Sequence, residues 1–485
     1  MAAESPRRRA RREPMSKVDT AWLRMERPTN PMMITGVLML DQRLSLAGLR
    51  EVIERRFLEY TRFRQKAVET PGGALWQDDR HFDLGWHVQV AALPGRDEQG
   101  FSEKLALEQF VSQLASSPLD KSKPLWQFHL VEHYAGGSAL VARIHHSYAD
   151  GIALVQVLLS LTDTRPEGVD LSQAWLQRDG AGVARRVGAV ERYRRLGGKV
   201  IDRGREMMQD PGLAAVLARE GGEIAKELVQ ALALPDDPPS LLRGELGISK
   251  RVAWAEPLDL DEVKAVGRAC GCTVNDVLMA AAAGALRGYM IERGADVDGM
   301  TLRATVPVNL RPLEHARKLG NHFGLVFLDL PVGEANPLRR LEHVAECMNQ
   351  LKKSRQAIVA YGLLAALGMA PQPMQALALE LFSRKATAVA TNVPGPQQPL
   401  FLAGCRVREL MFWVPQTGSI GLGISILSYN NRVHFGLIGD ARLIPDPEAV
   451  IRRFGPEFEK LLYLALMGDW ERSIDSVDAE ALMMG

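Results

Sequence analysis

The residues of this sequence best suited to chemistry are two adjacent histidines, His145 and His146, followed by Asp150 and Gly151. The apolar run before them predicts a strand that ends at the histidines. Because side chains alternate faces along a strand, the two imidazoles should point in opposite directions. We therefore expect one histidine to face a cleft and the other to be packed behind it. Histidine is the side chain most easily tuned to accept a proton near neutral pH.

The residues after the histidines predict the start of a helix over Ile152–Leu161. Asp150 stands where the N-cap of this helix belongs, and Gly151 is expected to let the backbone turn sharply. A core histidine beside a capping aspartate would give the same pattern. The motif alone therefore leaves a structural and a catalytic interpretation open.

Composition narrows the function classes. With 485 residues and a hydrophobic fraction of 46%, we expect roughly two to four domains with a large core. The net charge of +1 gives no argument for a nucleic-acid partner. The four cysteines show no paired spacing, so we predict no metal site and no disulfide framework, and a reducing cytoplasmic location fits. Neither a signal peptide nor a membrane-spanning run is predicted.

Several catalytic motifs are missing from the sequence. It has no phosphate-binding glycine loop and no nucleophile elbow. What remains is a histidine base without a neighbouring nucleophilic side chain, which suits direct transfer of an acyl group to a hydroxyl. The oxyanion formed on the way needs a fixed donor, and the amide of Asn275 near a helix N-terminus is a candidate. Simple helix capping by Asn275 and Asp276 is the alternative.

The chain divides into four predicted segments: a disordered basic arm (1–14), an α/β unit with the histidines (15–163), a helical basic linker (164–250) and a second α/β unit (251–485). The arm is either a solvated tail or a contact for anionic lipid or nucleic acid. The linker's basic amphipathic pattern is typical of a helix on a membrane surface or of an ordinary inter-domain helix. The segment 235–239 is predicted to be a linker as well.

The two units should be built from alternating strands and helices. In the first, Asp19 is expected to cap a short helix. Apart from the histidine strand, the strands and helices expected in the two units include 21–26, 33–40, 46–58, 127–133, 259–269, 274–293, 302–309, 325–330, 338–353, 388–393, 421–427, 432–439 and 447–466. Apolar segments between 358 and 382 are predicted to be buried core or the wall of an apolar cleft.

Several motifs resemble those of one family, the bacterial wax ester synthase/acyl-CoA:diacylglycerol acyltransferases of the CoA-dependent acyltransferase superfamily. The resemblance covers nearly everything from Met15 onward. It rests on the histidine motif 145–151 together with the segments Pro124-Leu125-Trp126, Asn275-Asp276-Val277, Val306-Pro307-Val308-Asn309-Leu310-Arg311, Gly320-Asn321 and Asn392-Val393-Pro394-Gly395-Pro396.

This resemblance implies an α/β (α+β) fold of two chloramphenicol-acetyltransferase-like domains, arranged as a pseudo-dimer with an active-site tunnel between them. It implies that His146 is the general base, that His145 supports the site, and that no covalent intermediate forms. Asp150 would be structural, paired with an arginine for which Arg311 is the candidate. Asn275 would be a catalytic residue as well, and Asp276, Gly151 and Trp126 would support the site.

The implied reaction moves a fatty acyl group from acyl-CoA to diacylglycerol or a long-chain alcohol. Acyl-CoA would be a co-substrate rather than a bound cofactor, and the protein would attach peripherally to the inner face of the cell membrane or to lipid inclusions. Two alternatives stay open. One is a condensation-type acyltransferase that uses a carrier-protein thioester, and the other is a non-catalytic protein that coats storage lipid.

Overall fold

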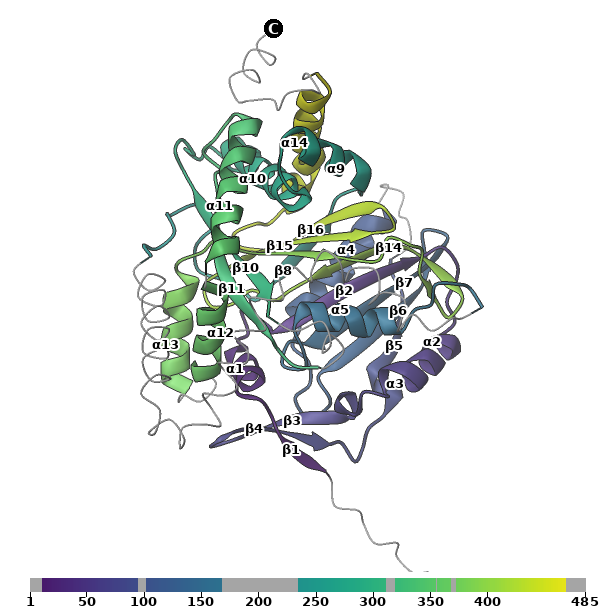
Figure 1. Cartoon of the computed structure of the whole chain (residues 1–485). Helices are drawn as coiled ribbons and strands as arrows, with labels where there is room; N and C mark the ends of the chain where they lie inside the picture. The colour runs from purple at the N-terminus through teal and green to yellow at the C-terminus, as the bar shows by residue number, and fades with distance from the viewer. Residues whose placement is uncertain are drawn as a thin grey trace, which may run out of the picture.

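Two mixed sheets, each with helices packed on it, form the body of the protein (Figure 1). The computed structural model describes residues 11–94, 102–167, 234–310, 319–354, 356–367 and 372–467. Two sheets with helices agree with the predicted α/β (α+β) class. The predicted helical part of the linker, and Arg311, lie outside the described residues.

The first sheet carries the histidine motif at the end of a central strand. β2 has the predicted bounds, and β7 ends at His145. The strand order is β13 (Phe401–Leu402), β14 (Cys405–Trp413), β2 (Met33–Leu40), β7 (Gly137–His145), β6 (Trp126–Tyr134) and β5 (Val88–Ala91).

Helices cover both faces of this sheet. Side chains of α5 (Gly151–Ser160) share one apolar cluster with the even-numbered residues of β2, and α4 (Glu103–Ser116) shares another with Val37 and Met39. Helix α4 also faces β8 of the second sheet. Its Ser112 and Ser116 hydroxyl oxygens accept the backbone N–H groups of Val252 (2.9 Å) and Lys250 (2.7 Å). These serines satisfy donors on an edge strand that would otherwise be left unpaired.

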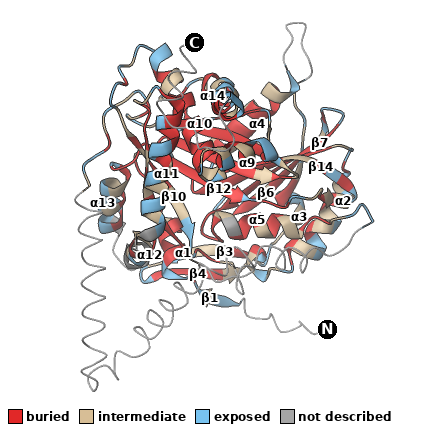
Figure 2. Cartoon of the chain, turned by 45° about the horizontal axis from the view of Figure 1, so that its top comes forward, coloured by how far each residue is buried: buried red, intermediate tan, exposed pale blue. Residues whose placement is uncertain are grey.

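The second sheet has four helices on one face, and α10 lies deep in the molecule (Figure 2). The helices are α9 (Leu260–Ala269), α10 (Val274–Glu292), α11 (Pro337–Lys353) and α14 (Glu448–Met467). The strand order is β11 (Phe323–Leu330), β10 (Leu302–Asn309), β12 (Ala388–Pro394), β15 (Leu422–Tyr429), β16 (Arg432–Asp440) and β8 (Lys250–Trp254), with β9 (Leu258–Asp259) also on β16.

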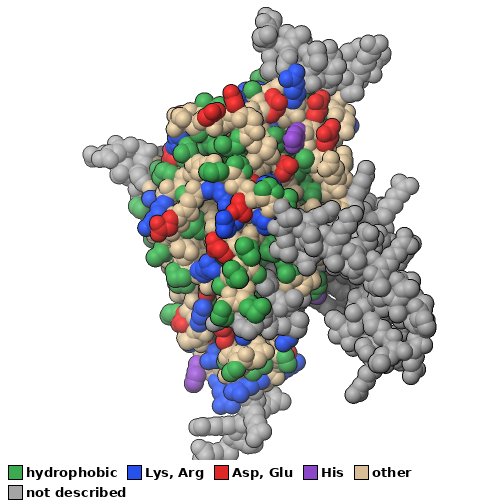
Figure 3. All heavy atoms as spheres, turned by 90° about the vertical axis from the view of Figure 1, so that its left-hand side faces the viewer, with side chains coloured by type: hydrophobic (Ala, Val, Ile, Leu, Met, Phe, Trp, Pro, Cys, Tyr) green, Lys and Arg blue, Asp and Glu red, His purple; other side chains and the backbone are tan. Residues whose placement is uncertain are grey.

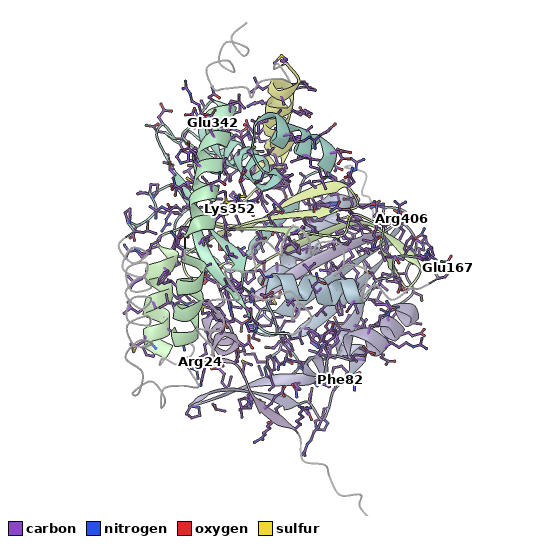
Figure 4. All side chains as sticks on the ribbon, viewed as in Figure 1. Arg24, Phe82, Glu167, Glu342, Lys352 and Arg406 are labelled. Carbon is purple, nitrogen blue, oxygen red and sulfur yellow. The ribbon has the colours of Figure 1, made fainter. Side chains whose placement is uncertain are left out.

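Smaller elements pack around the two sheets. Helix α1 packs against α12 and α13, and its Arg24 reaches the carbonyl oxygens of Thr70 and Gly73 in a small hairpin (Figure 4). The bounds are β1 (Arg12–Pro14), β3 (Gln65–Thr70), β4 (Gly73–Asp78), α1 (Lys17–Met25), α2 (Leu46–Val52), α3 (Leu84–His87), α12 (Gln356–Leu367) and α13 (Gln372–Ser383), with a π-helix at Ile53–Phe57 and a 3-10 turn at Thr61–Arg64.

The predicted boundary of the second unit is wrong in one respect, because β13 and β14 belong to the first sheet. Strand β14 pairs antiparallel with β2, and in Figure 1 it lies beside strands from the opposite end of the chain. The two sheets approach closely there. A Cβ on Gly436 of β16 would lie 2.7 Å from the Met411 side chain and 3.0 Å from that of Trp413. Only glycine allows β16 to approach β14 this closely.

Three other expectations are corrected. Arg12–Pro14 of the predicted arm pairs with β4 as a short edge strand. Ser16, not Asp19, caps α1, because the Ser16 side chain accepts the Asp19 N–H while Asp19 itself is buried. The segment at 235–239 is fixed to the second sheet, because the Asp237 carboxylate accepts hydrogen bonds from Thr387 and from the Arg303 N–H.

A buried ion pair joins an N-terminal loop to the second sheet. The Lys250 ammonium donates to Asp440 Oδ2 (2.9 Å) and to Asn30 Oδ1 (3.2 Å), and the Asn30 amide donates in turn to the Gly418 carbonyl (2.9 Å). Lys250 and Asp440 are both inaccessible to solvent. Burial lowers the pKa of Lys250, and the hydrogen bond from Lys250 to the Asp440 carboxylate opposes that shift.

We predict that Lys250→Met lowers the free energy of unfolding by about 3–5 kcal/mol, because it leaves the Asp440 charge buried without its cation. Denaturant unfolding followed by circular dichroism measures this. The matched control is Lys264→Met, which removes a lysine paired with Asp261 where both side chains are exposed (42% and 68%). The control should change stability by less than about 1 kcal/mol. Equal losses in the two variants would contradict the prediction.

Candidate active site

The two histidines do point to different surroundings, as strand alternation predicts. His146 lies on the wall of a cavity together with Asp150 and Gly151. His145 is fully buried on the other side, where its Nδ1 lies 2.8 Å from Ser147 Oγ and its Nε2 lies 3.7 Å from Glu26 Oε1. Only His146 is therefore placed to meet a molecule in the cavity.

Aromatic rings fix the His146 imidazole. Trp22 stacks on it at 4.1 Å between ring centroids, with an interplanar angle of 23°, and Phe323 lies at 5.6 Å. Burial lowers the pKa of His146 to about 4, and the Asp150 carboxylate acts in the opposite direction. The imidazole is therefore neutral at pH 7, the state in which it can accept a proton.

His145 is held in one tautomer. The Ser147 N–H donates to its Nδ1 (3.1 Å), so the ring proton lies on Nε2, toward Glu26. Burial lowers the pKa of His145 to about 3, with a smaller effect of Lys121 in the same direction. A neutral, hydrogen-bonded His145 shapes the turn that presents His146.

Asp150 is an N-cap, as predicted, and it also reaches the second unit. Its Oδ1 accepts the Ala153 N–H (2.8 Å) at the start of α5, and its Oδ2 accepts the His322 N–H (3.1 Å). Gly151 has no left-handed backbone conformation, and a Cβ there would meet Val414 at an ordinary 3.6 Å. The expectation that Gly151 permits a sharp turn is therefore wrong. The absence of a side chain at Gly151 instead leaves space in the cavity.

A short loop of the second unit supports the histidine turn. The Asn321 amide donates to the His146 carbonyl (2.9 Å) and to Asp19 Oδ1 (2.8 Å), and the Gly320 N–H donates to the Tyr148 carbonyl (3.0 Å). Gly320 has a φ of +116°, which favours glycine. Asn321 was not among the predicted site residues, although the Gly320-Asn321 pair was noted in the sequence.

Both units contribute to the cavity, which contains about 680 Å³ of empty space including open solvent. It lies between the two sheets, where the tunnel was expected. Most of its walls are apolar, with a few amides and hydroxyls. The lining residues are Trp22, His146, Asp150, Gly151, Thr305, Pro307, Asn309, Phe323, Leu325, Val389, Thr391, Asn392, Val393, Phe412, Val414, Pro415 and Thr417.

Asn275 and Asp276 lie behind this wall rather than on it. Asn275 Oδ1 accepts a hydrogen bond from the Asn392 amide (2.8 Å), and Asn392 is the residue that lines the cavity. Asp276 is buried and completes a capping box with Thr273 at the start of α10. Asp276 therefore has the helix-capping role of the alternative interpretation. Asn275 instead orients the side chain of Asn392.

Trp126 is part of the core of the first unit. It is fully buried, its Nε1 donates to the Phe63 carbonyl (2.7 Å), and it stacks on His87 at 4.2 Å. It does not line the cavity. The aromatic residues that do contact His146, Trp22 and Phe323, carried no motif that would have singled them out.

One group of side chains in the described part of the chain has the spacing of metal ligands. Potential ligand atoms of Asp329, His343 and Cys347 lie within 4.8 Å of one another, on β11 and α11, and none of these residues lines the cavity. The sequence did not indicate this group, because one member comes from a strand and two from a later helix.

No single described helix is long and apolar enough to cross a membrane. Helices α9 and α10 reach the necessary length and hydropathy only when taken together, and the pair is bent by 98°.

The arrangement suits proton transfer to a neutral base in a mostly apolar site. No serine or cysteine lines the cavity, so the described walls offer neither of the commonest covalent nucleophiles. An imidazole, a nearby carboxylate and an amide can instead assist an attack by one bound molecule on another.

Known proteins of one family match this chain over most of its length. Residues 15–278 match the wax ester synthase/diacylglycerol acyltransferase catalytic domain, and residues 319–462 match the WS/DGAT C-terminal domain. A Mycobacterium tuberculosis protein named "Probable diacyglycerol O-acyltransferase tgs1" is 30% identical over 85% of this chain and 86% of its own length. A Mycobacterium bovis protein named "Putative diacyglycerol O-acyltransferase Mb0919" is 29% identical over 95% of this chain and 92% of its own length.

Solved structures share the two-unit fold. The wax ester synthase/diacylglycerol acyltransferase from Marinobacter aquaeolei VT8 superposes with a TM-score of 0.65 at 23% identity, covering 94% of this chain and all (100%) of that one. The first condensation domain of the calcium-dependent antibiotic synthetase superposes with a TM-score of 0.58 at 17% identity, covering 96% of this chain and 98% of that one. The expected fold is thereby confirmed, and the chain belongs to the wax ester synthase/diacylglycerol acyltransferase family.

Proposed function

We propose that this protein transfers a fatty acyl group from acyl-CoA to the hydroxyl of a diacylglycerol or a long-chain alcohol. The products are triacylglycerol or wax ester, and CoA. The observation that carries the proposal is the neutral, buried imidazole of His146 on the wall of a mostly apolar cavity shared by both units. Family membership and the names of the relatives support the substrate class.

The reaction needs a single proton shuttle. His146 accepts the proton of the acceptor hydroxyl while the hydroxyl oxygen attacks the thioester carbonyl carbon. The tetrahedral intermediate then collapses, the carbon–sulfur bond breaks, and the sulfur takes the proton from the imidazolium, so that CoA leaves as a thiol. No acyl group becomes attached to the protein. The apolar walls keep water away from the thioester.

Other residues position this chemistry. Asp150 fixes the start of α5 and favours the imidazolium electrostatically. The Asn392 amide lies on the cavity wall and is oriented by Asn275, so we assign the oxyanion donor to Asn392 and an orienting role to Asn275. Acyl-CoA enters as a co-substrate and leaves as CoA in every turnover.

We further propose that the acceptor is drawn from a lipid surface, the inner face of the cell membrane or a lipid inclusion, onto which α13 docks. Its Met374, Leu377 and Leu381 are exposed (62%, 63% and 43%) at helical spacing, while Leu379 is buried with Trp22 in one apolar cluster. Figure 3 views the side of the molecule that carries α13, where hydrophobic side chains gather among charged ones.

We predict that His146→Ala lowers kcat by about 10²–10⁴-fold, the usual contribution of a general base. Release of CoA thiol from palmitoyl-CoA, with diacylglycerol or hexadecanol offered in parallel, measures this. His434→Gln is the matched control, because His434 is also buried, with its pKa lowered to about 4 by burial, and lies outside the cavity wall. A His146→Ala protein with full activity would remove the assigned base.

The pH dependence of kcat/KM should follow from the protonation of His146. Since the base must be neutral, kcat/KM should be flat from pH 6 to 8 and fall on the acid side with a midpoint near 4, the pKa of His146. Asp150→Asn removes a charge that raises this pKa, so the acid limb should move to lower pH. Circular dichroism at each pH separates titration from unfolding. A limb near pH 6.5 in the folded wild type would contradict the assignment.

The lipid-surface proposal predicts a selective defect. Replacing Met374, Leu377 and Leu381 by glutamine together should weaken flotation with diacylglycerol-containing phospholipid vesicles by about tenfold or more, since each side chain loses apolar burial. Turnover of a short, water-soluble alcohol should stay within twofold. Ile291→Gln, at an exposed position on α10 (46%), is the control. Unchanged flotation of the triple variant would exclude α13 as the docking helix.

A further inference from the structure

A second cavity lies beside the first, shares the lining residue Phe412 with it, and is lined almost wholly by apolar side chains. It contains about 400 Å³ of empty space including open solvent, and Phe412 lines both cavities. The lining residues are Leu38, Val155, Leu158, Leu159, Thr162, Leu400, Val407, Leu410, Met411, Phe412 and Leu427.

One face of α5 runs along both cavities. Gly151 lines the first, and Val155, Leu158, Leu159 and Thr162 line the second. Apart from the adjacent pair Leu158 and Leu159, these positions are spaced by three or four residues, so they form one stripe on and just beyond the helix. From Gly151 to Thr162 the stripe extends for about 16 Å at the helical rise of 1.5 Å per residue.

One face of β14 and its continuation forms the opposite wall. Val414 and Phe412 line the first cavity, and Phe412, Leu410 and Val407 line the second. Alternate residues of a strand share a face, so Leu410 and Phe412 lie on the same side of β14. The register of β14 against β2 shifts between Val407 and Glu409, and this shift places Val407 on that side as well. We call the space between these two walls the α5–β14 trough.

Phe412 closes the trough at its midpoint. Its ring is buried (3% exposed), and the residue paired with it on β2 is Gly36, where a Cβ would lie 3.8 Å from Leu158 and 3.9 Å from Phe412. A side chain in place of Gly36 would therefore contact both α5 and Phe412. As the side chains stand, the second cavity admits little more than a water-sized sphere, so an alkyl chain can enter only when lining side chains move, and Phe412 is the lining residue that both cavities share.

We propose that the α5–β14 trough binds the alkyl chain of the fatty acyl group and that Phe412 is the gate that sets the acyl length accepted; this inference rests on the proposed function. A narrow, largely enclosed, apolar channel takes one chain, whereas diacylglycerol brings two. The opposite wall of the catalytic cavity, formed by Trp22 and Phe323, belongs to the cluster that reaches α13, the proposed lipid-docking helix. The acceptor thus arrives from the α13 side, and the acyl chain extends away from it.

The test compares acyl and alcohol chain lengths separately. Val407→Phe fills the far end of the trough, and its ratio of kcat/KM for palmitoyl-CoA over octanoyl-CoA should fall at least tenfold, at about fourfold for each methylene no longer buried. Phe412→Leu widens the gate and should raise the same ratio. With palmitoyl-CoA held fixed, the ratio for hexadecanol over decanol should stay within twofold in both variants.

Phe128→Leu is the matched control, because Phe128 is fully buried on the same sheet and lines neither cavity. It should leave both ratios unchanged. Acyl selectivity that is unchanged in Phe412→Leu, or a shift in alcohol selectivity instead, would overturn the trough assignment while leaving the proposed activity intact. Absence of thiol release by the wild type with every acyl-CoA would instead overturn the proposed function and this inference together. Phe412→Leu decides the matter even where Val407→Phe fails to fold.

Discussion

The site depends on the hydrogen bonds that join the histidine turn of one unit to the 319–322 loop of the other. Asp150 accepts the His322 N–H, and Asn321 donates to the His146 carbonyl. The Asn321 bond is buried and the His322 bond is partly buried, so separating the two units would remove a donor from both the His146 carbonyl and the buried Asp150 carboxylate. The orientation of the His146 imidazole is therefore tied to the relative placement of the two units, and neither unit alone contains the complete cavity wall.

Strand β14 imposes a second constraint of the same kind. It comes from the later half of the chain and pairs with β2 in the first sheet. Phe412 in this strand and Val414 just after it lie on the cavity wall. The pairing of β14 with β2 and the shape of the cavity thus depend on the same stretch of chain. A change that shifts the register of β14 by one residue would turn Phe412 away from the trough, because alternate residues face opposite sides of a sheet.

Local rules explain which features the sequence could reveal. Strand alternation separated His145 from His146, and the N-cap role of Asp150 follows from its position before an apolar helical pattern. Features that depend on distant pairing were missed. Strand β14 pairs with residues far away in sequence, and Asn392 replaces Asn275 on the cavity wall only because β12 passes in front of α10. Asp19 looked like a helix cap, but its partner Asn321 lies about three hundred residues away (sequence separation 302).

Burial of His146, the proposed base, has opposite effects on the two halves of the proposed reaction. It lowers the pKa of His146 to about 4, which keeps the imidazole ready to accept a proton, but it also disfavours the imidazolium that forms when the acceptor is deprotonated. The Asp150 carboxylate acts against this second effect, and its two backbone hydrogen bonds keep it in place. The helix cap therefore has an electrostatic task in addition to its structural one. An apolar cavity suited to fatty substrates can remain competent for proton transfer because this one fixed charge lies beside the base.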